Sequence, residues 1–68
     1  MKAKEMFKKL GWQEREETSS TYCIKSYRKH EHIIYFDYDK QIDIGAIMID
    51  LDLLKAINKQ VEELGWNK

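Results

Sequence analysis

The fold of this chain depends on residues 50–66, DLDLLKAINKQVEELGW. Apolar residues recur there every three or four positions, with polar residues between them, which is the pattern of an amphipathic α-helix. The apolar positions are Leu51, Leu54, Ile57, Val61 and Leu64. We therefore predict a helix over residues 51–64 whose apolar stripe packs against a second layer of the same fold.

Both ends of this helix carry recognisable signals. Asp50 is a suitable N-cap, and the carboxylate of Asp52 in the first turn meets the positive end of the helix dipole. Gly65 favours a left-handed C′ position, which would let Trp66 fold back onto Val61 in a Schellman closure. The helix is therefore predicted to begin and end within this stretch.

A shorter helix is predicted near the N-terminus, over residues 2–10, where apolar residues again share one face. The opposite face carries Lys2, Lys4, Lys8 and Lys9. Gly11 ends this helix, and Leu10-Gly11-Trp12 repeats the order of Leu64-Gly65-Trp66. We expect Trp12 to pack on Phe7 in the same way.

Strand-forming segments fill the middle of the chain. Runs rich in β-branched and aromatic residues cover residues 21–28, 32–38 and 41–49, and the charged segment 13–17 reads equally well as an edge strand or as a loop. The gaps between the runs fit hairpins and are too short for crossover helices, so the sheet must be antiparallel.

The second hairpin can be placed in register from its apolar residues. A loop at residues 38–40 sets Phe36 opposite Ile42 and gathers the large apolar side chains on one face, which should receive the helices. The first strand can be paired in either of two registers. A tight turn that pairs Arg28 with Glu31 turns Cys23 and Tyr27 inward, whereas a loop longer by one residue turns Ile24 inward.

These elements predict an α+β fold in one domain over residues 1–68: a two-layer sandwich with a three- or four-stranded antiparallel meander and both helices on one face. The other face would keep Ile33 and Tyr35 outside, which is more apolar than contact with water requires. A core of this size also gains from association. We therefore expect a homodimer or a higher homo-oligomer.

Composition excludes several classes of function. Twelve basic and twelve acidic residues give a net charge of zero, which argues against a general nucleic-acid or membrane binder. Lysines interrupt the N-terminus, so neither a leader nor a membrane span is expected, and Cys23 is the only cysteine. These features predict a cytoplasmic protein.

No constellation in the sequence indicates catalysis or a metal. His30 and His32 would point the same way on a strand, but a third ligand is missing. Cys23 would need a base and an oxyanion hole that the neighbouring sequence does not supply. We expect no enzyme activity, no metal and no cofactor, with a small cysteine-dependent hydrolase as a remote alternative.

Basic residues near the first hairpin are interleaved with aromatic ones, a combination that can stack a base and pair with its phosphate. Together with the apolar outer face they define the predicted binding residues, Tyr27, Arg28, Lys29, His32, Ile33 and Tyr35. A small nucleotide-like ligand would bind there, between subunits. The alternative is a nucleic-acid-binding regulator that uses Lys4, Lys8 and Lys9 of the first helix.

Taken whole, the chain resembles a group of small uncharacterised proteins of Firmicutes phages and prophages. The resemblance rests on Phe7, Leu10 and Gly11, on residues 33–37, and above all on the C-terminal run that ends in Glu63-Leu64-Gly65-Trp66. The chain departs from the group at residues 13–18, where an apolar residue of a first strand is usual. The group has no catalytic or binding motif, so the resemblance implies only a phage accessory protein.

These observations together favour a non-enzymatic accessory protein that acts by binding. Its target would be a host protein or a sequestered small molecule, with counter-defence as one such role.

Overall fold

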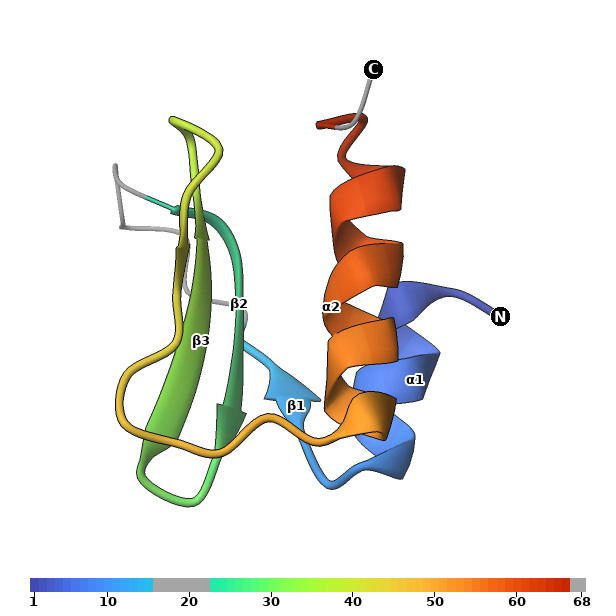
Figure 1. Ribbon diagram of the computed structural model, residues 1–68, viewed down its shortest axis with the longest axis vertical. Helices are drawn as coiled ribbons and strands as arrows, with labels where there is room; N and C mark the ends of the chain where they lie inside the picture. Colours follow the sequence, from blue (N-terminus) through green and yellow to red (C-terminus); the bar gives the residue numbers. More distant parts are fainter. Residues whose placement is uncertain (16–22, 67–68) are drawn as a thin grey trace.

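Two helices pack on one face of a four-stranded antiparallel sheet (Figure 1). The computed structural model describes residues 1–15 and 23–66. In chain order the elements are α1 (Ala3–Lys9), β1 (Gln13–Glu14), β2 (Cys23–Lys29), β3 (His32–Asp37), β4 (Ile42–Asp43) and α2 (Leu51–Glu63). The strands form a meander in the order β1-β2-β3-β4. The predicted α+β sandwich is confirmed.

The last strand is much shorter than predicted. The sequence suggested a strand over residues 41–49, but β4 pairs with β3 only at Ile42–Asp43. A strand that reached residue 49 would leave only Asp50 to cross from the sheet to the helix layer, because α2 begins at Leu51. Residues 44–50 form that crossing instead. At the other edge β1 exists as Gln13–Glu14, while residues 16 and 17 of the predicted 13–17 strand lie outside the described residues.

The first hairpin adopts neither predicted register. Lys29 pairs with His32, so the turn is His30–Glu31, and His30 has a φ of 56°. Tyr27 consequently pairs with Ile34 and shares the inner face with it. The register shifts between Cys23 and Lys25, so an inward Tyr27 does not bring Cys23 with it. In the second hairpin Phe36 pairs with Ile42, as predicted.

An aromatic cluster fills the space between the layers. Phe7 of α1 stacks on Tyr27 with ring centroids 3.9 Å apart, and Phe36 meets both rings edge-on. Trp12 packs edge-on against Phe7, and Trp66 lies with its ring centroid 6.1 Å from that of Phe36. Such pairs add to the stabilisation given by burial alone, so this cluster is the centre of the core.

The helix α2 faces the core with only part of the predicted stripe: Ile57 is buried, and Val61 and Leu64 are partly buried against the core, as predicted. Its buried side chains are Leu53, Ala56, Ile57 and Gln60. Leu51 and Leu54 were expected to be inside, but they are exposed. In this orientation Gln60 faces the buried hydroxyl of Tyr27, which needs an acceptor. The hydroxyl donates a hydrogen bond to Oε1 of Gln60.

The helix ends follow the sequence signals. Oδ1 of Asp50 accepts a hydrogen bond from the backbone N–H of Leu53 at 2.8 Å, which confirms the N-cap. The N–H of Trp66 donates to the carbonyl of Val61, and that of Trp12 donates to the carbonyl of Phe7. Both helices thus end in Schellman closures, with φ of 75° at Gly65 and 91° at Gly11.

A carboxylate from α2 caps α1. The backbone N–H of Ala3 donates a 2.7 Å hydrogen bond to Oε2 of Glu63, while the N-cap residue Lys2 makes no side-chain cap bond of its own. A negative group at a helix N-terminus is favourable. This contact joins the first turn of α1 to the last turn of α2.

Candidate functional site

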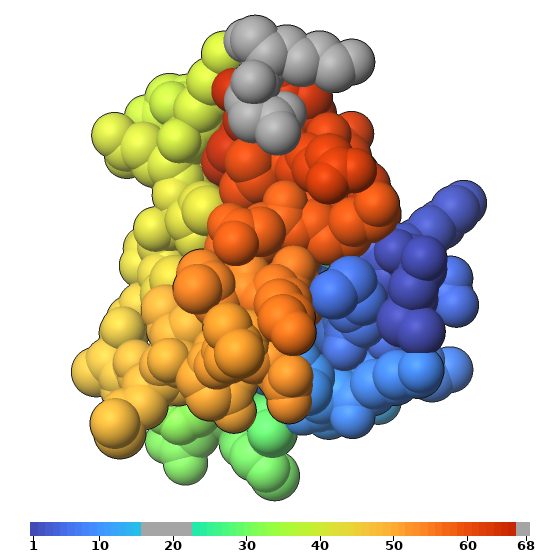
Figure 2. Space-filling model, turned by 45° about the vertical axis from the view of Figure 1, so that its right-hand side comes forward, coloured from blue at the N-terminus to red at the C-terminus, as the bar shows by residue number. Residues whose placement is uncertain are grey.

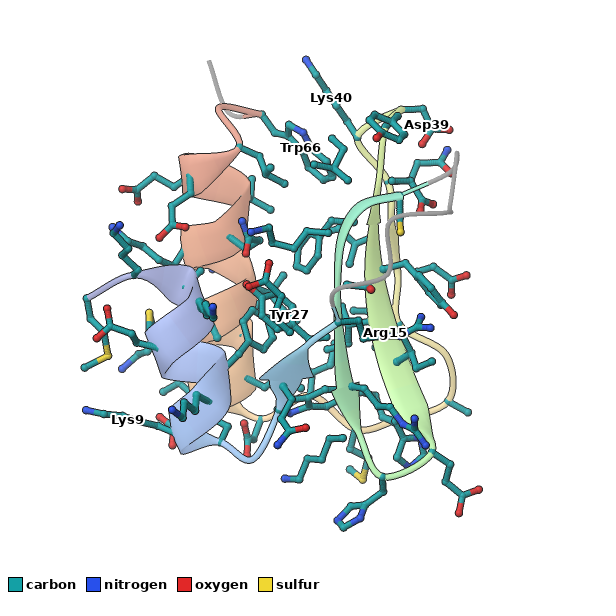
Figure 3. All side chains as sticks on the ribbon, turned by 180° about the vertical axis from the view of Figure 1, so that it is seen from behind. Lys9, Arg15, Tyr27, Asp39, Lys40 and Trp66 are labelled. Carbon is teal, nitrogen blue, oxygen red and sulfur yellow. The ribbon has the colours of Figure 1, made fainter. Side chains whose placement is uncertain are left out.

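Tyr27 is not available as a binding residue. Its side chain is fully buried between the sheet and the two helices (Figure 3). Burial raises the pKa of its hydroxyl above the ordinary value, and the charges of Glu14 and Glu63 add to the rise. The prediction that Tyr27 lines a binding site is therefore wrong, since the same aromatic ring completes the core.

Three other predicted binding residues lie on the outer face of the sheet. Arg28 pairs with Ile33, and Tyr35 pairs with Ser26 two positions further along. Nε of Arg28 donates to the carbonyl of His30 at 2.8 Å. Ile33 and Tyr35 are half-buried and line a shallow hollow of about 320 Å³ beside Asp43. This face exposes less apolar surface than the sequence suggested.

Lys29 and His32 come together in a larger pocket, of about 420 Å³, that opens at the end of the first hairpin. Nζ of Lys29 donates a 2.9 Å hydrogen bond to the carbonyl of Leu10, which ties the hairpin to the end of α1. His30 lines the same pocket. Apolar walls complete it, formed by Leu10, Trp12, Ala46, Ile47, Met48 and Leu53.

Large apolar side chains beside this pocket are exposed. Met48 is 96% exposed, Leu51 64%, and Ile49 and Leu54 are each 43% exposed. We call these four residues the 48–54 surface. In Figure 2 the gold and orange residues of this segment lie beside the green end of the first hairpin. Since Met48 also lines the pocket, the surface and the pocket form one continuous site.

Sequence reasoning missed the 48–54 surface. It assigned Ile49 to a long strand and placed Leu51 and Leu54 in the buried stripe of α2. One signal was present: Leu51, Leu53 and Leu54 cannot all face the same side of a helix. An excess of leucines at the start of α2 indicated a second apolar face.

The basic face of α1 is partly neutralised. Glu14 of β1 lies 2.8 Å from Nζ of Lys25 and 3.6 Å from Nζ of Lys4. Partial burial alone would raise the pKa of Glu14, but the hydrogen bond and charge of Lys25, with the charge of Lys4, lower it below the ordinary value. The Lys4 side chain stays 68% exposed, so Glu14 offsets part of the positive charge of this face without burying Lys4.

The structure locates the residues considered for metal and catalytic chemistry. Within residues 1–15 and 23–66, no group of three or more His, Cys, Asp or Glu side chains could hold a metal ion. Cys23 is half-buried and lies opposite Asp37. No helix in the described part of the chain is long and apolar enough to cross a membrane.

Comparison with protein-family models, curated proteins and solved structures finds no match to this chain. Its function must therefore be argued from the site itself.

Proposed function

We propose that this protein is a non-enzymatic binding protein that engages a partner protein through the 48–54 surface. The exposure of Met48 and Leu51 carries the proposal. Exposed apolar side chains that lie together mark interaction sites more often than scattered ones do. Their exposure means that these side chains bury little of their apolar area within the fold.

The contact surface differs from the one that the sequence suggested. Ile33 and Tyr35 are half-buried, whereas Met48 and Leu51 stand in solvent beside a pocket. Binding energy concentrates where a large side chain can enter a pocket and exclude water. A second copy of this chain is the alternative partner, and the mass of the purified protein in solution tests it directly.

The experiment compares Leu51→Glu with Tyr38→Glu. The two wild-type side chains are almost equally exposed, at 64% and 62%, but Tyr38 lies in the β3–β4 turn, outside the 48–54 surface. We expect proteins retained from bacterial lysate by the wild type and by Tyr38→Glu to be lost with Leu51→Glu. An identical set of retained proteins for all three would contradict the proposal.

A self-association experiment runs in parallel on the same variants. If the partner is a second copy, light scattering will show a dimer for the wild type and for Tyr38→Glu and a monomer for Leu51→Glu. A dimer that persists in Leu51→Glu but dissociates in Tyr35→Glu would instead mean that the dimer interface lies on the outer face of the sheet.

A small ligand in the pocket is the second candidate, because the pocket combines Lys29, two histidines and Asp50 with apolar walls. Native mass spectrometry of the protein purified without denaturation measures any retained mass. Extra mass that the wild type carries and His32→Glu lacks would favour a small molecule sequestered in the pocket. A clean apoprotein favours the protein partner.

A further inference from the structure

Met48 differs in its surroundings from the other sulfur-containing side chains of this chain. The sequence has three methionines and one cysteine, and Met48 is almost fully exposed. Met6 is partly buried against the core, and Cys23 is half-buried. Met1 is also exposed, but it precedes α1 and lies outside the 48–54 surface. Met48 is therefore the sulfur-containing side chain that is both open to solvent and part of the candidate site.

An exposed thioether can be oxidised by a peroxide, which must reach the sulfur atom to react. The sulfur attacks one peroxide oxygen, so that an S–O bond forms and the O–O bond breaks. The other oxygen takes up the proton of the transferred hydroxyl and leaves as water. The sulfur loses two electrons and the peroxide gains them, and the product is a polar methionine sulfoxide.

The sulfoxide would change the surface far more than the fold. Its oxygen would stand among the apolar side chains of Ile49, Leu51 and Leu54, the other members of the 48–54 surface. A partner that covered this surface would have to remove water from that oxygen, which costs free energy unless a donor replaces the water. The fold should tolerate the change, because a side chain so exposed contributes little buried area.

We propose that Met48 is an oxidation site and that its sulfoxide weakens partner binding at the 48–54 surface without unfolding the protein. The oxidant is a peroxide. This inference rests on the proposed function, since it assumes that the 48–54 surface binds a protein.

Limited treatment of the intact protein with hydrogen peroxide tests the site. Peptide mass spectrometry measures which methionine gains an oxygen atom first. Met48 should react faster than Met6 and no more slowly than Met1. Urea unfolding of the protein oxidised at Met48 should give the midpoint of the untreated protein. Oxidation of Met6 ahead of Met48, or a marked fall in that midpoint, would overturn the proposal.

Peptides serve as probes of binding, because they can be selected without knowledge of the natural partner. Short random peptides are selected on phage against the untreated protein, and those whose binding is abolished by Leu51→Glu are kept. Oxidation of Met48 should weaken their affinity, measured by fluorescence anisotropy, about tenfold or more, the effect of burying an unpaired polar group. A methionine sulfoxide reductase, with dithiothreitol as the electron donor, should restore the affinity by removing the oxygen as water.

Met48→Leu is the matched control, since leucine keeps an apolar side chain of similar volume and has no sulfur. This variant should bind the peptides as the wild type does and should keep its affinity after peroxide treatment. A loss of affinity in treated Met48→Leu would assign the effect to another side chain and overturn the proposal.

Failure of this inference can be distinguished from failure of the proposed function. Peptides that depend on Leu51 but bind the Met48 sulfoxide as tightly as the untreated protein would overturn the inference and leave the binding surface standing. A selection that yields no peptide dependent on Leu51 would overturn both.

Discussion

The aromatic core and the 48–54 surface use similar residue types in opposite ways. In the core, Phe7, Tyr27 and Phe36 are fully buried, and the one polar group among them, the hydroxyl of Tyr27, has its acceptor in Gln60. On the surface, Met48 and Leu51 face solvent within a few residues of buried Leu53. Helix α2 thus carries two apolar faces, one that stabilises the fold and one that the fold does not need.

Stability and binding should therefore depend on different residues of this molecule. Substitutions in the core should change the free energy of unfolding, whereas substitutions on the 48–54 surface should change association alone.

Phe7→Ala should have the largest effect. The ring stacks on Tyr27 and contacts Phe36 and Trp12, so its removal should cost about 3–5 kcal/mol of unfolding free energy. Urea unfolding followed by circular dichroism measures this loss. Leu51→Ala is the matched control and should stay within about 0.5 kcal/mol of the wild type. Equal losses in the two variants would contradict the separation.

Tyr27→Phe keeps the ring but removes the hydroxyl, which leaves Oε1 of Gln60 buried without its donor. The expected loss is about 1–3 kcal/mol. Tyr35→Phe, at a half-buried tyrosine of the outer face, should change stability far less. A loss for Tyr35→Phe as large as that for Tyr27→Phe would mean that the buried hydrogen bond is not the cause.

The same tyrosine predicts a response to alkaline pH. The folded state raises the pKa of Tyr27, so its contribution to stability is complete below the unfolded value of about 10 and falls as the pH rises above it. Thermal unfolding measured between neutral pH and pH values above 10 should show a decline that is smaller in Tyr27→Phe. An unchanged decline would show that other groups cause it.

Glu14→Gln should have a smaller effect. Because the folded state lowers the pKa of Glu14, its stabilising contribution is present above the unfolded value of about 4.5 and is lost as the pH falls through the folded pKa. The pair is partly exposed, so the loss at neutral pH should be below about 1 kcal/mol. At pH values below the folded pKa the variant and the wild type should converge, and a constant difference at all pH values would reject this linkage.

Leu51→Glu should change stability least of all, within about 0.5 kcal/mol, although it places a charge where a leucine stood. A carboxylate in the first turn of α2 also suits the helix dipole. Its effect should instead be the loss of partner binding. A marked drop in the urea midpoint would show that Leu51 belongs to the core after all.

Local signals in the sequence predicted the parts of this fold that depend on neighbouring residues. The Asp50 cap and the two glycine closures follow from backbone hydrogen bonding within one turn. The register of the second hairpin followed from matching Phe36 with Ile42. These features need no knowledge of the rest of the chain.

Features that depend on contacts between distant residues were not predictable in this way. Buried Gln60 accepts the hydrogen bond of Tyr27, and the two are far apart in the sequence. The face of α2 that meets the sheet and α1 leaves Leu51 and Leu54 exposed. Of the predicted site, Lys29 and His32 do meet in one pocket, but the apolar part of the site came from an unforeseen helix rotation.

The repeated Leu-Gly-Trp closure has a practical consequence. It places Trp12 on the wall of the pocket and Trp66 against Phe36, on the side of the β3–β4 turn (Figure 3). Trp66→Phe would leave Trp12 as the single tryptophan, whose emission would report on occupation of the pocket. Trp12→Phe would leave Trp66 to report on unfolding. The two tryptophans thus report separately on the pocket and on unfolding.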